Sequence, residues 1–231
     1  MGQENLEKIA AELADWDLLQ NLPEQIESFR LVKGEGIKGQ VLILAAYVDE
    51  TTHCRLDIIY AGETCDFMVV KIVGLHVFVD ECSYSRDKDD FGKMLLAKLP
   101  EFIRSVDRHQ PHAFDYEAQD LHFEEWDYWR KLPEKIGDYT LFITPDNPLP
   151  YINGSFIFLD YVDFSKGNEL YLAYNVFRNE IFAELKHERM PLTTNIFDVP
   201  SKVPDHKKLV VLSDLLAKKL HKVLEKLPFT Q

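Results

Sequence analysis

Apolar residues recur every three or four positions in three long segments of the chain, which is the spacing of one face of an α-helix. The first segment covers residues 6–16, and the pattern stops before Pro23, because proline disfavours helical geometry in the residue that precedes it. Two more helices are predicted over residues 87–106 and 205–227. Each of these two starts at an aspartate that is placed to cap the first turn.

A fourth helix is predicted over residues 116–130, where aromatic side chains are frequent and the periodicity is less regular. Shorter apolar runs between the helices predict strands. Residues 40–48 are almost entirely apolar, as in a strand buried on both faces, whereas residues 55–60 alternate, as in a strand with one face in a core. Further strands are predicted over residues 65–73, 76–80, 155–162, 170–174, 180–187 and 194–199. The predicted fold class is therefore α+β.

The two halves of the sequence repeat each other. Residues 14–26, ADWDLLQNLPEQI, match residues 124–136, EEWDYWRKLPEKI. Two shorter matches follow at larger offsets: Tyr47-Val48-Asp49 with Tyr161-Val162-Asp163, and LLAK at residues 95–98 with LLAK at residues 215–218. An offset that grows along the chain is expected if loops were lengthened in the second copy.

We interpret this pattern as a tandem duplication. The first repeat comprises residues 1–110 and the second comprises residues 111–231. Each repeat is predicted to contain a helix, four or five mostly antiparallel strands and a C-terminal helix. The connection between the repeats is short, so we expect them to be related by a pseudo-two-fold axis.

The amino-acid composition and the net charge limit which kinds of partner the protein can bind. The chain has 231 residues, of which 46 % are hydrophobic and 12 % are aromatic, so it has the means to form a core. Its net charge of −13 would repel a polyanion, and we expect no nucleic acid partner. The last predicted helix holds a basic cluster, which suits either the negative end of the helix dipole or a phosphate-binding face: Lys207, Lys208, Lys218, Lys219, Lys222 and Lys226.

Cellular location is predicted from cysteines and from the N-terminal residues. Cys54, Cys65 and Cys82 are odd in number and match no metal-binding spacing, which favours reduced thiols in a cytoplasm. The N-terminal segment lacks the basic and apolar regions of a secretory signal. No run approaches the roughly 18 apolar residues of a membrane span. We therefore expect a cytoplasmic protein with no membrane partner.

One group of residues could form a metal site near the boundary of the repeats. His109, His112, Asp115 and His122 offer nitrogen and oxygen ligands suitable for zinc. Pro111 lies between the first two histidines and prevents a regular helix from aiming both the same way. Exposed polar residues are also expected in such a connection. We favour this second interpretation and predict no metal.

Asp49 and Asp163 form a second candidate pair, because duplicated carboxylates that come close together can divide the roles of acid and base. Each also follows Tyr-Val and precedes a turn, where aspartate is favoured for its own hydrogen bonds. The turn interpretation is the simpler of the two.

A third candidate is the aromatic set formed by Trp16, Trp126, Tyr128 and Trp129. Such residues can line a ligand or partner surface. The recurrence of the first two at one repeat position favours a core role for them.

Sequence motifs of catalysis are absent. The chain has no P-loop, no dinucleotide-binding fingerprint, no kinase signature and no glycine elbow of a hydrolase serine. We predict no catalytic residue and no cofactor, and a non-catalytic protein that binds another protein or a small-molecule ligand. The alternative is a hydrolase-like small-molecule enzyme with its site between the repeats. A regulator of nucleic-acid metabolism is disfavoured by the charge.

Overall fold

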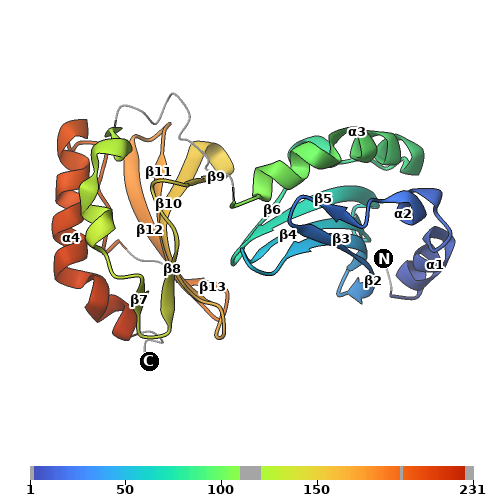
Figure 1. Cartoon of the computed structure of the whole chain (residues 1–231), viewed down its shortest axis with the longest axis horizontal. Coiled ribbons are helices and arrows are strands. Elements are labelled where there is room, and N and C mark those ends of the chain that lie inside the picture. The colour runs from blue at the N-terminus through green and yellow to red at the C-terminus, as the bar shows by residue number, and fades with distance from the viewer. Residues whose placement is uncertain (1–2, 110–120, 193–194, 227–231) are drawn as a thin grey trace. The chain divides into compact units, whose positions relative to one another are not determined.

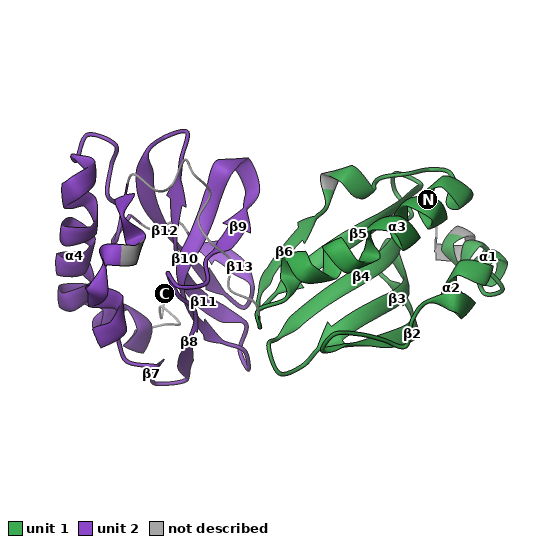
Figure 2. Ribbon diagram, turned by 45° about the horizontal axis from the view of Figure 1, so that its top comes forward, with its two compact units in different colours: residues 1–110 green, residues 111–231 purple. Residues whose placement is uncertain are grey.

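A computed structural model of the chain describes residues 3–109, 121–192 and 195–226 (Figure 1). The chain divides into two compact units, unit 1 with residues 1–110 and unit 2 with residues 111–231 (Figure 2). Each unit contains helices and one antiparallel sheet. This confirms the predicted α+β class with antiparallel sheets. No helix among the described residues has the length and apolar character needed to cross a membrane.

Unit 1 is a meander of six strands with helices before and after it. The sheet order follows the chain, and every neighbouring pair is antiparallel. The elements are α1 (Gln3–Leu13), α2 (Asp17–Asn21), β1 (Gln25–Ile26), β2 (Phe29–Lys38), β3 (Val41–Asp49), β4 (Cys54–Ala61), β5 (Asp66–Val73), β6 (His76–Val79), the 3-10 helix η1 (Glu81–Ser83) and α3 (Lys88–Val106). The prediction of four or five strands is wrong for this unit, because β1 and β2 were not predicted.

The core of unit 1 lies between α3 and one face of the sheet. The helix buries an apolar stripe that includes Phe91, Leu95 and Leu99. The Phe91 ring stacks on the Phe67 ring of β5, with 5.4 Å between their centroids, and the Trp16 ring lies 5.6 Å from the Phe67 ring. The predicted cap of this helix is confirmed, because the Asp87 carboxylate accepts hydrogen bonds from two backbone amides of the first turn.

Unit 2 has a seven-stranded sheet with the order β13-β12-β11-β10-β8-β7, and β9 also pairs with β10. The elements are the 3-10 helices η3 (Phe123–Glu125) and η4 (Asp127–Lys131), β7 (Lys135–Ile136), β8 (Tyr139–Ile143), β9 (Leu149–Tyr151), the 3-10 turn η5 (Ile152–Gly154), β10 (Ser155–Asp163), β11 (Asn168–Asn175), β12 (Glu180–His187), β13 (Met190–Leu192) and α4 (Asp205–Glu225). Four or five strands were predicted here too, and that number is wrong. The additional strands are the short ones.

Three local predictions for unit 2 are corrected. The described part of the predicted helix 116–130 forms two short 3-10 helices instead, while residues 116–120 lie outside the described residues. The predicted strand 194–199 is reduced, in its described part, to one bridge between Val199 and Ile181. Asp205 is the first residue of α4 and not its cap. Its carboxylate binds the Lys208 ammonium at 2.5 Å.

The core of unit 2 lies between α4 and one face of the sheet. Leu212, Leu216 and Leu220 of the helix are buried with Phe158 of β10. The Trp126 indole, between the two 3-10 helices, donates a hydrogen bond to Ser213 Oγ of α4 at 2.8 Å. These contacts fix the irregular segment before β7 onto the helix.

Candidate functional site

The last residue of β3, Asp49, is the centre of a polar network in unit 1. Its side chain is 3 % exposed. One carboxylate oxygen accepts hydrogen bonds from the Thr51 amide at 2.9 Å and from the Thr51 hydroxyl at 2.6 Å. The other oxygen lies 2.8 Å from Nε2 of His109, which is 60 positions later in the chain. Asp49 therefore both shapes the β3–β4 turn, as the sequence suggested, and orients an imidazole.

The protonation of Asp49 follows from these contacts. Burial by itself would raise the pKa of the carboxyl, but the hydrogen bonds from Thr51, Ser28 and His109 outweigh burial and hold the pKa well below its ordinary value. Asp49 is therefore an anion at neutral pH. Its oxygens are already engaged within the unit, so it is poorly suited to take up a further proton.

A groove of about 760 Å³ opens beside this network. Its floor is one row of the sheet, in which Arg30 of β2 lies opposite Val48 of β3, and Val48 lies opposite Arg55 of β4. The lining consists of Ser28, Arg30, Val32, Glu35, Val48, Asp49, Glu50, Thr51, Arg55 and His109. All of these residues belong to unit 1.

Most charges around the groove are paired with each other. The Arg55 guanidinium binds Glu35 at 2.7 Å and also binds Asp57. The bonds from Arg55 and Lys38 lower the pKa of Glu35 to about 2. Arg30 is exposed, and within the described part of the chain no carboxylate lies within ion-pair distance of it. Among the described residues the groove thus presents one unpaired cation, Arg30, and one unpaired anion, the exposed Glu50, on an otherwise paired polar surface.

The structure does not bring the four candidate metal ligands together among the described residues. His109 lies beside Asp49 in the groove. His122 adopts a left-handed backbone conformation, with φ of 51°, where η3 begins. His112 and Asp115 lie outside the described residues. The contact between His109 and Asp49 joins two candidates that the sequence kept separate.

Asp163 holds the corresponding turn of unit 2. Its carboxylate accepts hydrogen bonds from the Ser165 amide at 3.0 Å and from the Ser165 hydroxyl at 2.6 Å. The adjoining pocket is smaller, about 280 Å³, and Lys166 at its wall is paired with Asp138 at 2.6 Å. This turn therefore lacks both the larger groove and the exposed arginine found in unit 1.

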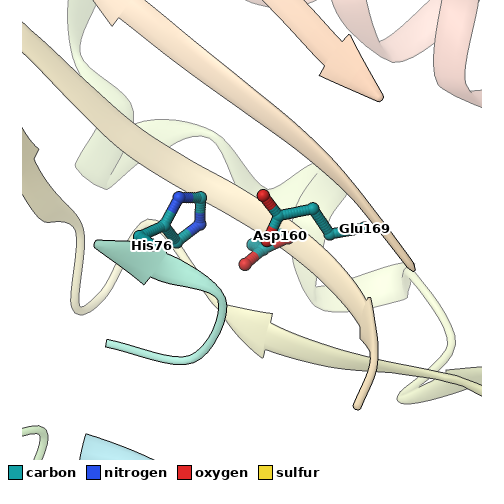
Figure 3. A group of neighbouring side chains, drawn as sticks. All are labelled: His76, Asp160 and Glu169. Carbon is teal, nitrogen blue, oxygen red and sulfur yellow. The ribbon is translucent and has the colours of Figure 1, made fainter. Parts of the chain in front are cut away.

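Buried carboxylates in the sheet of unit 2 were missed by sequence reasoning. Asp160 of β10 and Glu169 of β11 are both buried, and Figure 3 shows them on adjacent strands. The Glu169 carboxylate pairs with Lys186 on β12, which lies directly opposite it in the register. Burial raises the pKa of Asp160 well above its usual range. The signal was the aspartate that interrupts the apolar run SFIFLDYV. Figure 3 also labels His76 of β6, which belongs to unit 1.

The aromatic candidates contribute mainly to packing. Trp16 and Trp126 are buried in the cores of their own units. Tyr128 and Trp129 are partly buried against the core of unit 2, and the Arg130 guanidinium lies 5.0 Å from the ring of Trp129.

Among the described residues, the groove of unit 1 is larger than the pocket beside Asp163 and is lined by more polar groups. Comparison of the chain with known protein families, with curated proteins and with solved structures found no match.

Proposed function

We propose that this protein is a non-catalytic binding protein built from two homologous α+β repeats, and that the Asp49 groove of unit 1 is its ligand site. The expected ligand carries a carboxylate, either as a small molecule or as part of a protein partner. Arg30 is the residue that would receive that carboxylate.

The repeat part of the proposal is supported by backbone pairs and hydrogen bonds at matching positions of the two units. In both units a two-residue turn joins a two-residue strand to the strand that follows it, with Ile26 opposite Phe29 in one and Ile136 opposite Tyr139 in the other. A tyrosine hydroxyl then donates to the carbonyl of the preceding proline: Tyr47 to Pro23 at 2.8 Å, and Tyr161 to Pro133 at 2.6 Å. Long-range bonds at matching positions are difficult to explain without common ancestry of the two halves.

The order of strands adds independent support. In unit 1 the order is β1-β2-β3-β4-β5-β6, and the main path of unit 2 runs β7-β8-β10-β11-β12-β13. Each sheet is followed by a long helix, α3 or α4. The additional β9 lies between β8 and β10 in the sequence. This is the part of the chain where the offset between the matching residues of the two repeats increases.

The binding part of the proposal depends on one observation, the state of the charges around the groove. Asp49 is hydrogen-bonded and Arg55 is ion-paired within unit 1. The exposed Arg30 and Glu50 have no ion-pair partner among the described residues, and Arg30 is the one of these two that can receive an anion. An arginine presents a planar fork of donors that matches a carboxylate. Because the surrounding groups are already fixed, binding there would require little reorganisation.

Titration of the full-length protein with glutarate, followed by nitrogen-15 NMR, tests this site. We expect a saturable shift of the Arg30 side-chain Nε–H signal, and at least a tenfold loss of affinity in Arg30→Gln. The matched control is Arg178→Gln in unit 2, which removes an exposed, already paired arginine and should leave the affinity unchanged. Absence of saturable shifts, or equal affinity in Arg30→Gln, would overturn the assignment of the ligand site.

An enzyme remains the second candidate because of the Asp49–His109 contact. A carboxylate that orients an imidazole is a common arrangement for a general base. Hydrolysis of p-nitrophenyl esters and phosphates by the full-length protein would test it. Saturable turnover that disappears in His109→Ala would favour the enzyme, and no turnover above that of the variant would favour binding alone.

A further inference from the structure

The outer edge of β2 is open along most of its length. On that side the strand that pairs with β2 is β1, whose two residues pair with Phe29 and Arg30, and α1 also contacts β2. The Leu31 amide still donates to the Glu24 carbonyl at 2.9 Å. Because alternate amides of a strand point the same way, the Lys33 amide points to this edge as well, beyond Gln25, the first residue of β1. No other strand of the described residues pairs with β2 there.

Two grooves flank this open edge. The polar groove described above receives Arg30 and Val32 from β2. A second groove of about 370 Å³ receives Lys33 and two glycines from β2 and is otherwise mostly apolar; it is lined by Ala10, Leu13, Ala14, Leu19, Gln20, Lys33, Gly34, Gly36, Leu42, Ile43 and Leu44. Side chains of Val32 and Lys33 project to opposite faces of the sheet, since successive residues of a strand alternate. The edge therefore has a polar groove on one side and an apolar groove on the other.

The strand in the corresponding position of unit 2 does not offer such an edge. β8 has five residues against ten in β2. The chain after it contains Pro145, Pro148 and Pro150 and returns as β9. Proline removes backbone donors and is one of the devices that block pairing at sheet edges. β2 contains no proline and keeps its backbone donors, and its one interruption is the bulge at Gly34 and Gly36, where φ is positive.

The charges of β2 indicate which kind of peptide segment would fit its open edge. β2 carries three basic residues and one acidic residue, a local charge of about +2 by simple counting at neutral pH, although the whole chain is at −13. Its acidic residue, Glu35, is already paired with Lys38 and Arg55. Lys33, like Arg30, is exposed and has no ion-pair partner among the described residues. An acidic strand would therefore be attracted to this edge.

We propose that β2 binds an extended peptide segment of a partner protein by adding it to the sheet as an antiparallel or parallel strand. The segment alternates acidic and apolar side chains over about six residues, the length that matches the open part of β2 at roughly 3.3 Å per residue. Its acidic side chains lie on the side of the polar groove that holds Arg30, and its apolar ones enter the groove beside Leu13. Backbone hydrogen bonds give the affinity and the two grooves give the specificity. The inference rests on the proposed function and names its partner.

Calorimetric titration of the full-length protein with acetyl-Glu-Val-Glu-Val-Glu-Val-amide tests the inference. Two control peptides have the same side chains but carry N-methyl groups on alternate backbone amides. One is methylated at the even positions and the other at the odd positions. We expect one of these two to bind at least tenfold more weakly than the parent, because it cannot pair with β2. Equal binding of all three peptides, or no binding of the parent, would overturn the inference.

A protein variant gives a second test. Lys33→Pro removes the outward amide and should weaken binding of the parent peptide at least tenfold relative to Lys33→Ala, which removes only the side chain. The peptide comparison decides the question without a variant if Lys33→Pro does not fold. Glutarate separates the two proposals: glutarate binding without peptide binding overturns the strand addition alone, whereas failure of glutarate overturns the proposed carboxylate site itself.

Discussion

Replacement of Asp49 by asparagine should destabilise unit 1 selectively. The asparagine amide oxygen can keep the two hydrogen bonds that Thr51 donates, because both go to the same carboxylate oxygen. The amide nitrogen is a donor, so it can bond His109 Nε2 only if the imidazole changes tautomer, and that bond lacks the charge of the carboxylate. A hydrogen bond to a charged group contributes about 1.5–3 kcal/mol. His109 is 47 % exposed, so we reduce the expected loss to about 1–2 kcal/mol.

Native-state hydrogen exchange in urea, read by mass spectrometry, assigns the loss to a unit. With a slope of about 1.5 kcal/mol per molar urea, the midpoint for peptides from β3 and β4 should fall by about 1 M. Asp163→Asn is the control, because its turn bonds also go to one oxygen and its other oxygen has only a distant contact with the exposed Lys166, at 3.6 Å. Asp163→Asn should lower the free energy of unfolding by less than Asp49→Asn does, and only in unit 2. Equal losses in the two variants would refute the role of His109.

The same substitution has a predicted pH dependence. The pKa of Asp49 in the folded chain is lowered, so its ionisation stabilises the fold above the unfolded pKa of about 3.9 and the contribution is lost as pH falls through the lower folded value. The difference between wild type and Asp49→Asn should therefore be complete at pH 7 and shrink steadily below about pH 4. A difference that stays constant down to pH 2 would contradict the electrostatic explanation.

Three other predictions concern the packing of the units. Tyr47→Phe and Tyr161→Phe should each cost about 1 kcal/mol in their own unit, because each loses a hydroxyl bond to a backbone carbonyl; hydrogen exchange in urea measures both. Asp205→Ala should cost about 2 kcal/mol, because it leaves the fully buried Lys208 ammonium without its carboxylate, whereas Lys208→Met should cost less than about 1 kcal/mol; calorimetric unfolding compares them. Gly154→Ala should cost at least about 1 kcal/mol because of its φ of +66° and because the added methyl group requires the exposed Phe177 ring to move, as measured by the same calorimetry.

Elements with regular apolar periodicity could be predicted from the sequence. The stripe that includes Phe91, Leu95 and Leu99, together with the cap at Asp87, places α3 within one residue of its observed start. The apolar run 40–48 likewise gives most of β3. In these segments local pattern and tertiary packing require the same conformation, so the sequence suffices.

β2 could not be predicted because its pattern does not resemble a strand. Gly34 and Gly36 have positive φ values of 67° and 80°, and a bulge there shifts the register against β3. Most of the strand is not buried, so hydrophobic alternation is weak. The preceding turn has Glu27 at φ of 54°, where a glycine or asparagine would have signalled a hairpin.

The candidate site depends on contacts between distant residues. Asp49 was predicted as a turn residue, and it does hold the turn. Its contact with His109, 60 positions away, follows only from the return of the chain after α3. Arg30 was not identified, because a single arginine in an unpredicted strand carries no sequence signal of its own.

Amide hydrogen exchange of the protein, with and without acetyl-Glu-Val-Glu-Val-Glu-Val-amide, tests whether a peptide strand adds to β2. We expect the peptide to slow exchange of the Lys33 amide, which points to the open edge of β2, and to leave the amides of β8 unchanged. Unchanged exchange at Lys33 in the presence of saturating peptide, or equal protection of β2 and β8, would contradict strand addition at β2.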